Sequence, residues 1–216
     1  DCKLLNTIEK RKEFASNAFK NTFLYDRSIY KYFSNNHFLI EQEIDTTFKT
    51  RYGENPHQNA VFFGNLDEIF LKLNGKEISY NNLLDINSAV QLISEFEEPT
   101  FAILKHNNAC GIASRENMID SWKSALKSDP VSAFGGVLIC NRTIDSQTAK
   151  EINKIFFEVL IAPNFDEDAL NILREKKNRI ILKQKKFKFD SVEHRSVLGC
   201  ILSQEKDTKI DTIEKK

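Results

Sequence analysis

The sequence of 216 residues has few of the residues that bend, cross-link or start a chain: seven glycines, four prolines, four cysteines and one methionine, Met118. No apolar run reaches the roughly 18 to 20 residues that cross a bilayer, and the N-terminus lacks a signal-peptide pattern. We therefore expect a cytoplasmic protein that contacts no membrane. Because the chain starts at Asp1 and its methionine lies well inside, we expect a piece of a longer product.

Cysteine spacing and charge exclude further classes. The four cysteines are far apart and form no C-x-x-C pair, which argues against a structural zinc site and against a disulfide scaffold. We expect reduced thiols and no bound metal. Thirty-one lysines and arginines balance thirty-one aspartates and glutamates, so no global field would recruit nucleic acid. Any site for an anion must therefore be local.

Apolar periodicity divides the chain. Residues 4–33 repeat apolar positions at helical spacing without proline or glycine, which predicts one broken helix or two short helices. Residues 34–50 are mostly polar, and we place a domain boundary near residue 43. Beyond it, helical and extended patterns alternate, which predicts an α/β sheet covered by helices. The expected helices are 83–96, 117–127, 145–156 and 166–176, and the expected strands are 100–105, 136–140, 158–162 and 179–182.

Two polar clusters could bind or transform a ligand. Residues 51–58, R-Y-G-E-N-P-H-Q, place a guanidinium and a phenol on a tight turn, which suits a nucleotide but also an ordinary surface turn. Residues 105–111, K-H-N-N-A-C-G, follow a buried strand, and strand ends face the ligand crevice in open α/β sheets. His106 could be a general base, with Lys105 favouring the neutral imidazole and stabilising an oxyanion. The alternative is a structural or surface histidine.

A third cluster, residues 128–136, ends in Gly135 and Gly136. It permits close approach of the backbone to a flat ligand, or is a tight turn into the sheet. Glu158 could accept a hydrogen bond from a ribose or an amino group, or could be only solvated. The strings G-x-G-x-x-G, G-x-x-x-x-G-K-[ST], G-x-S-x-G and H-E-x-x-H are absent. Dinucleotide, P-loop, hydrolase and zincin interpretations therefore lose support.

These strings resemble a known family. Residues 51–58 resemble the R-Y-G-E-N-P-H-Q signature of the bifunctional AICAR formyltransferase and IMP cyclohydrolase proteins, and residues 105–111 resemble their K-H-x-N-P-C-G segment. Segments 75–82, 129–136, 158–163 and 195–199 are similar to family segments in the same order, and 18–26 resembles the closing helices of the cyclohydrolase domain. The resemblance implies that residues 1–42 end the cyclohydrolase domain and that 43–216 begin the formyltransferase domain.

The resemblance implies a cytidine-deaminase-like α/β fold without zinc, after an N-terminal helical segment. The implied reaction transfers a formyl group from 10-formyltetrahydrofolate to AICAR in purine biosynthesis, in a homodimeric parent that also closes the product to IMP. By resemblance, Lys105 and His106 are the catalytic pair, and the nucleotide site is lined by Arg51, Tyr52, Gly135 and Glu158. The piece alone is expected to be inactive.

Two positions depart from the family pattern. Ala109 replaces the usual proline, which relaxes the backbone restriction on Asn108, and Thr50 replaces a leucine. Two alternatives stay open: a non-catalytic remnant or interaction module of the same fold, and a zinc deaminase, whose H-x-E and P-C-x-x-C strings are absent. The proposed site requires the Arg51 guanidinium and the His106 imidazole to converge on one pocket.

Overall fold

A computed structural model describes residues 7–34, 47–50 and 52–208. They belong to two compact units, one of residues 42–188 and one of residues 1–41 and 189–216, and each unit is described by itself. The expected domain boundary near residue 43 falls outside the described residues and stays a prediction.

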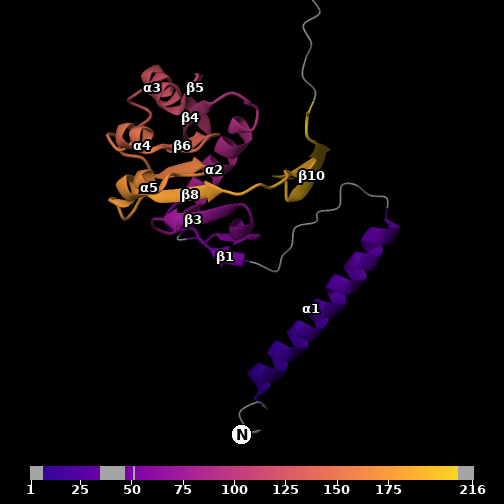
Figure 1. The fold of residues 1–216 in the computed structure, drawn as a ribbon. Coiled ribbons are helices and arrows are strands. Elements are labelled where there is room, and N and C mark those ends of the chain that lie inside the picture. Colours follow the sequence, from indigo (N-terminus) through magenta and orange to yellow (C-terminus); the bar gives the residue numbers. More distant parts are fainter. Residues whose placement is uncertain (1–6, 35–46, 51, 209–216) are drawn as a thin grey trace, which may run out of the picture. The chain divides into compact units, whose positions relative to one another are not determined.

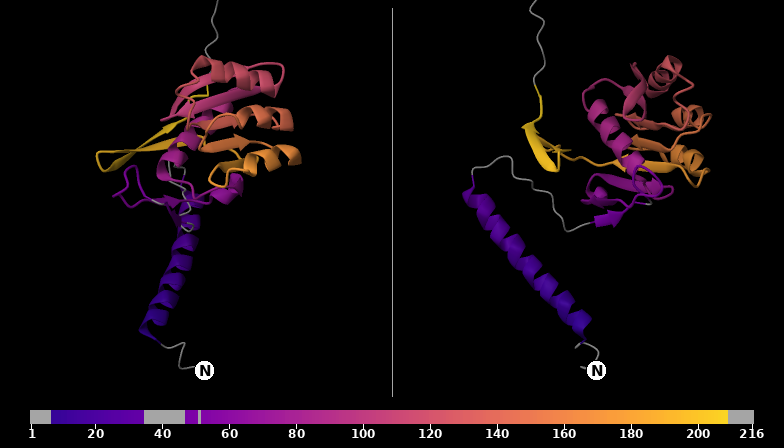
Figure 2. Two further views of the ribbon diagram at one scale, coloured as in Figure 1. Left: turned by 90° about the vertical axis from the view of Figure 1, so that its left-hand side faces the viewer. Right: turned by 180° about the vertical axis from the view of Figure 1, so that it is seen from behind.

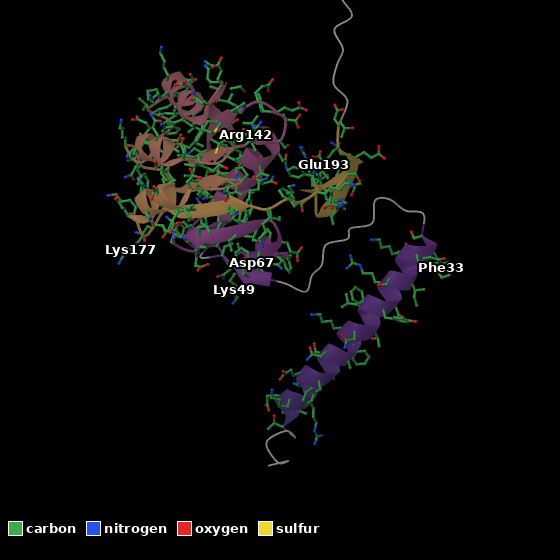
Figure 3. All side chains as sticks on the ribbon, viewed as in Figure 1. Phe33, Lys49, Asp67, Arg142, Lys177 and Glu193 are labelled. Atoms are coloured by element: carbon green, nitrogen blue, oxygen red, sulfur yellow. The ribbon has the colours of Figure 1, made fainter. Side chains whose placement is uncertain are left out.

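The N-terminal segment is one continuous helix, α1 (Ile8–Phe33) (Figure 1). The expectation of a broken helix or two short helices is wrong, because no proline or glycine interrupts the backbone hydrogen bonds of this stretch. Thr7 caps the helix by accepting from the Lys10 amide at 3.3 Å. No residue of α1 is buried, and Figure 3 shows its side chains projecting around the helix.

The same unit contains a hairpin that the sequence patterns did not predict. Strands β9 (Val192–Val197) and β10 (Cys200–Glu205) pair antiparallel. They are joined by Leu198 and Gly199, whose φ angles are 54° and 75°, as a two-residue turn with both residues left-handed requires. No residue of either strand is buried.

Residues 42–188 form a mixed α/β unit around a six-stranded sheet with the strand order β3-β8-β7-β6-β4-β5 (Figure 1). Strands β6, β7 and β8 are parallel, whereas β4 is antiparallel to β5 and β6, and β3 to β8. The strands are β3 (Phe70–Asn74), β4 (Thr100–Lys105), β5 (Asn108–Ser114), β6 (Val137–Cys140), β7 (Val159–Ala162) and β8 (Ile180–Gln184). The predicted α/β class is confirmed.

Four helices and a small second sheet complete this unit. The helices are α2 (Tyr80–Ile93), α3 (Met118–Ser128), α4 (Ser146–Ile152) and α5 (Glu167–Arg174). The second sheet pairs β1 (Thr47–Lys49) with β2 (Val61–Phe63), and a short 3-10 helix, η1 (Leu66–Glu68), follows. All four helices and four strands expected beyond residue 43 are present, although their ends differ by up to four residues. Strands β1, β2, β3 and β5 were not predicted.

The helices cover both faces of the large sheet. Helices α3, α4 and α5 lie on one face and α2 lies on the other (Figure 2). Alternate residues of β4, β6 and β7, such as Phe101 and Ile103 of β4, join Trp122 of α3 in the main core. All residues of β6 and β7 are buried, as expected for parallel strands covered on two faces. The sheet is therefore a fixed platform for the loops at its edges.

Candidate active site

Three predicted site residues lie on the same side of the large sheet, at the ends of neighbouring strands. Lys105 ends β4, whereas Gly135 and Glu158 come just before β6 and β7. Because β4 runs antiparallel to β6, with Leu104 opposite Val137, the end of β4 meets the beginnings of β6 and β7. The strand end that carries Lys105 therefore lies beside the starts of two strands, where Gly135 and Glu158 lie.

The segment after β4 is a tight hairpin. Two residues, His106 and Asn107, join β4 to β5, and their φ angles are 53° and 63°. A left-handed backbone costs a residue with a Cβ roughly 1–2 kcal/mol, and such strain is concentrated at functional sites. His106 is exposed, so the hairpin holds its imidazole at the rim of the sheet.

The neighbouring lysine reaches back over the third cluster. The Lys105 ammonium donates to the Phe134 carbonyl at 3.0 Å. The loop that contains Phe134 is shaped by Asp129, whose carboxylate accepts from the amides of Val131 and Ser132 at 3.2 and 2.9 Å. The bonds from Ser132 hold the pKa of the half-buried Asp129 below its usual range. The loop is therefore held in shape by its own hydrogen bonds.

Helix α2 links the hairpin to the first cluster. Asp85 accepts from the Asn107 amide at 2.7 Å, and the Ser88 hydroxyl lies 3.3 Å from the Asn107 side-chain oxygen. One turn earlier, the Asn81 side-chain Nδ2 donates to the Glu54 carbonyl at 3.2 Å. Spacings of four and three residues place these contacts on one helix face. The two contact points are about 6 Å apart along the axis, so both clusters lie along the same face.

The turn of residues 52–58 closes on itself. The Gly53 amide donates to the Gln58 carbonyl at 2.7 Å, and the Gln58 side chain accepts from the Asn55 amide at 2.8 Å. These bonds fix the turn as a rigid unit at the N-terminal end of α2. The sequence patterns did not single out Asn81, whose side chain holds the turn. The signal that could have found it is the polar face that Asn81 shares with Asp85 and Ser88 on α2.

The departure at position 50 has a structural role. Thr50 is buried, and its hydroxyl donates to the Tyr52 carbonyl at 2.7 Å, so it fixes the backbone that leads into the turn. Tyr52 is half-buried. Arg51 lies outside the described residues, and its convergence with His106 stays a prediction.

An exposed aromatic pair lies beside Gly135. The rings of Phe134 and Phe156 have centroids 5.3 Å apart, and both side chains are exposed. The Gly135 amide donates to the Phe156 carbonyl at 2.8 Å, which ties the loop before β6 to the loop before β7. An apolar surface therefore adjoins the Lys105 ammonium.

Glu158 has a partner that the sequence analysis did not single out. Its carboxylate lies 2.7 Å from the Lys76 ammonium, and both side chains are about 30% exposed. Lys76 belongs to the segment between β3 and α2. Its contact places this segment beside the start of β7, where Glu158 lies.

Cys110, in the second cluster, is unsuited to nucleophilic attack. Burial raises the pKa of its thiol, the carboxylates of Asp129 and Asp85 raise it further, and Lys105 opposes them. Among the described residues, no group of three or more His, Cys, Asp or Glu side chains could hold a metal ion. In the same part of the chain, no helix is both long and apolar enough to span a membrane.

These observations define an α/β domain with four charged or titratable groups at one end of its central strands. They are the His106 imidazole, the ammonium groups of Lys105 and Lys76, and the Glu158 carboxylate. Residues 3–216 match the family described as the AICARFT/IMPCHase bienzyme. The chain belongs to this family, as the resemblance of its motifs predicted.

Curated bacterial relatives support the assignment. The bifunctional purine biosynthesis protein PurH of Bacteroides thetaiotaomicron is 53% identical over 209 residues, which cover 96% of this chain and 41% of that protein. Those of Caldicellulosiruptor saccharolyticus and a Thermoanaerobacter species are 43% and 42% identical, each over 94% of this chain and 43% and 42% of their own length. The chain thus spans about two fifths of the curated relatives it matches.

Proposed function

We propose that this chain supplies part of the active site of a phosphoribosylaminoimidazolecarboxamide formyltransferase. The formyl group of 10-formyltetrahydrofolate passes to the 5-amino group of AICAR, and FAICAR and tetrahydrofolate are released. The parent protein also closes FAICAR to IMP, works in the cytoplasm and forms a homodimer. The observation that carries the proposal is the strained hairpin bearing Lys105 and His106, which α2 ties to the 52–58 turn.

The chemistry requires help with a proton and with a negative charge. The 5-amino group is a poor nucleophile because its lone pair is delocalised into the ring and the carboxamide. His106 removes its proton as the nitrogen attacks the formyl carbon, and Lys105 stabilises the tetrahedral oxyanion. Collapse of this intermediate breaks the bond between the formyl carbon and the folate nitrogen, which takes up a proton as it leaves.

The remaining site residues bind the two substrates in this proposal. The Arg51 guanidinium matches the phosphate of the nucleotide as a planar fork, Tyr52 contacts the nucleotide, and Glu158 accepts from its hydroxyl or amino groups. Gly135 lets the nucleotide approach the loop before β6. The exposed rings of Phe134 and Phe156 offer an apolar surface for the flat ring system of the reduced folate.

The proposal is tested in a chain extended in both directions, assayed with AICAR and 10-formyltetrahydrofolate. His106→Asn removes the base but suits the left-handed turn, because asparagine tolerates positive φ. We expect turnover to fall about 10²- to 10⁴-fold with a urea unfolding midpoint that is equal or slightly higher, since asparagine relieves backbone strain there. As a control, His194→Gln, on β9, should keep wild-type turnover.

Two results would replace the proposal. An extended protein that binds AICAR but shows no formyl transfer would be a non-catalytic remnant. Stoichiometric zinc in the purified protein, together with loss of activity on its removal, would indicate a deaminase-type mechanism instead.

A further inference from the structure

The ion pair between Lys76 and Glu158 differs from the other ion pairs near the sheet. It joins two half-buried side chains at 2.7 Å. By contrast, the Lys154–Glu151 pair is a local contact within three residues, and the Lys72–Glu77 pair is 3.6 Å long with the glutamate 85% exposed. A contact that links distant segments at a candidate site needs an explanation beyond ordinary surface pairing, which contributes little.

The backbone on the lysine side of the pair is held in place. Gly75, at φ 108°, lies so close to the Arg179 carbonyl that a Cβ atom would be 2.3 Å from its oxygen, and therefore only glycine fits. The Asn74 side chain donates to the carbonyls of Arg179 and Lys176 at 2.8 and 3.2 Å. These contacts fasten the segment after β3 across the start of β8, so that Lys76 reaches the strand beyond it.

The backbone on the glutamate side is equally fixed. The Glu158 amide donates to the Gly136 carbonyl, and its own carbonyl accepts from the Ile180 amide, both at 3.0 Å. With the backbone fixed, the direction of the carboxylate depends on the side-chain torsions of Glu158. The contact from Lys76 engages its Oε2 atom, and within the described part of the chain no second cation pairs with this carboxylate.

We propose that Lys76 is a positioning residue for the nucleotide, an inference that rests on the proposed function. It holds one oxygen of the Glu158 carboxylate, so that the other oxygen faces the site and accepts a hydrogen bond from a hydroxyl or amino group of the substrate. Its charge also offsets that of Glu158, which would otherwise repel a ligand that carries a phosphate dianion. Lys76 acts on the ligand through Glu158.

Calorimetric titration of the extended protein with AICAR tests this role. Lys76→Met should weaken binding roughly tenfold, the effect of losing one charge-assisted hydrogen bond, and Lys76→Arg should restore most of it. Because Lys76 acts through Glu158, Lys76→Met should have little further effect when Glu158→Gln is already present. The control Lys72→Met removes the neighbouring ion pair and should leave the affinity unchanged.

The possible results distinguish a positioning role of Lys76 from a purely structural role, and they test the proposed reaction separately. Additive losses in the double variant, or a lower urea midpoint without any change in affinity, would overturn the positioning role. Binding of AICAR without formyl transfer would refute the proposed reaction and still measure the effect of Lys76. A wild-type protein that does not bind AICAR would overturn both.

Discussion

At the scale of single residues, the site combines a strained group with groups that hold it. His106 adopts a positive φ that glycine or asparagine would adopt at lower cost. The Asn107 amide is fixed by Asp85, and Lys105 is held by the Phe134 carbonyl. Strain at an exposed histidine is consistent with a chemical role, because folding alone would favour another residue there.

The buried Cys140 thiol gives a test of pH dependence. Burial raises its pKa from an ordinary value of 9.0 to about 12. Above pH 9 the unfolded chain loses this proton while the folded chain keeps it, so the stability present below pH 9 is lost as the pH rises toward 12, at up to about 1.4 kcal/mol per unit. We expect Cys140→Ala to flatten this decline in urea unfolding between pH 9 and 11.

The exposed Cys200 thiol is the matched control for this measurement. Cys200→Ala should leave the slope of the free energy of unfolding against pH unchanged. An equal slope in wild type and Cys140→Ala would show that the buried thiol does not contribute to the alkaline instability.

Residue types in the sequence did not determine the geometry of the candidate site. Residues 52–58 and the string at 105–111 lie on a turn and on a hairpin that α2 connects, and Gly111 lies within β5. A Cβ atom there would be 2.0 Å from the Ala125 carbonyl, so this glycine allows α3 to approach the strand. Lys76, Asp85 and Asn81 were missed because their roles come from tertiary contacts between segments distant in sequence.

At the scale of elements, apolar patterns in the sequence predicted the buried strands well but did not predict the more exposed strands. Strands β4, β6 and β7 are continuous apolar runs in the sequence, because both of their faces are covered. Strand β5 contains the small and polar residues N-A-C-G-I-A-S and forms because the turn after Lys105 folds it back on β4. The direction of β5 follows from the hairpin turn, and the periodicity of apolar residues does not predict that turn.

The contact between α2 and the hairpin turn can be tested at the level of these elements. Asp85→Ala removes the acceptor of the Asn107 amide, which we expect to cost about 1 kcal/mol of local stability. The hydrogen-exchange protection of that amide, measured by NMR, should fall roughly fivefold to tenfold. Ser88→Ala removes only the 3.3 Å contact of the Asn107 side chain and should leave the amide protected. Unaltered exchange in Asp85→Ala would show that Asp85 does not hold the Asn107 amide.

At the scale of the whole molecule, burial is concentrated in one of the two units. Among the residues that the structure describes, the buried hydrophobic ones all lie between Phe70 and Leu182, and this unit carries every described residue of the candidate site. No residue of α1, β9 or β10 is buried. The stability of the sheet and its site should therefore come from residues 42–188 alone, since burial of apolar surface is the main favourable term in folding.

A shortened chain of residues 42–188 tests this division directly. We expect it to unfold cooperatively in urea with a midpoint and a free energy of unfolding close to those of the 216-residue chain, because none of the deleted residues that the structure describes is buried. The hydrogen-exchange protection of the Asn107 amide should also be the same, since Asp85 remains in place. A free energy of unfolding lower by more than about 2 kcal/mol would mean that α1 or the hairpin stabilises the sheet, and the two units would then have to be treated as one.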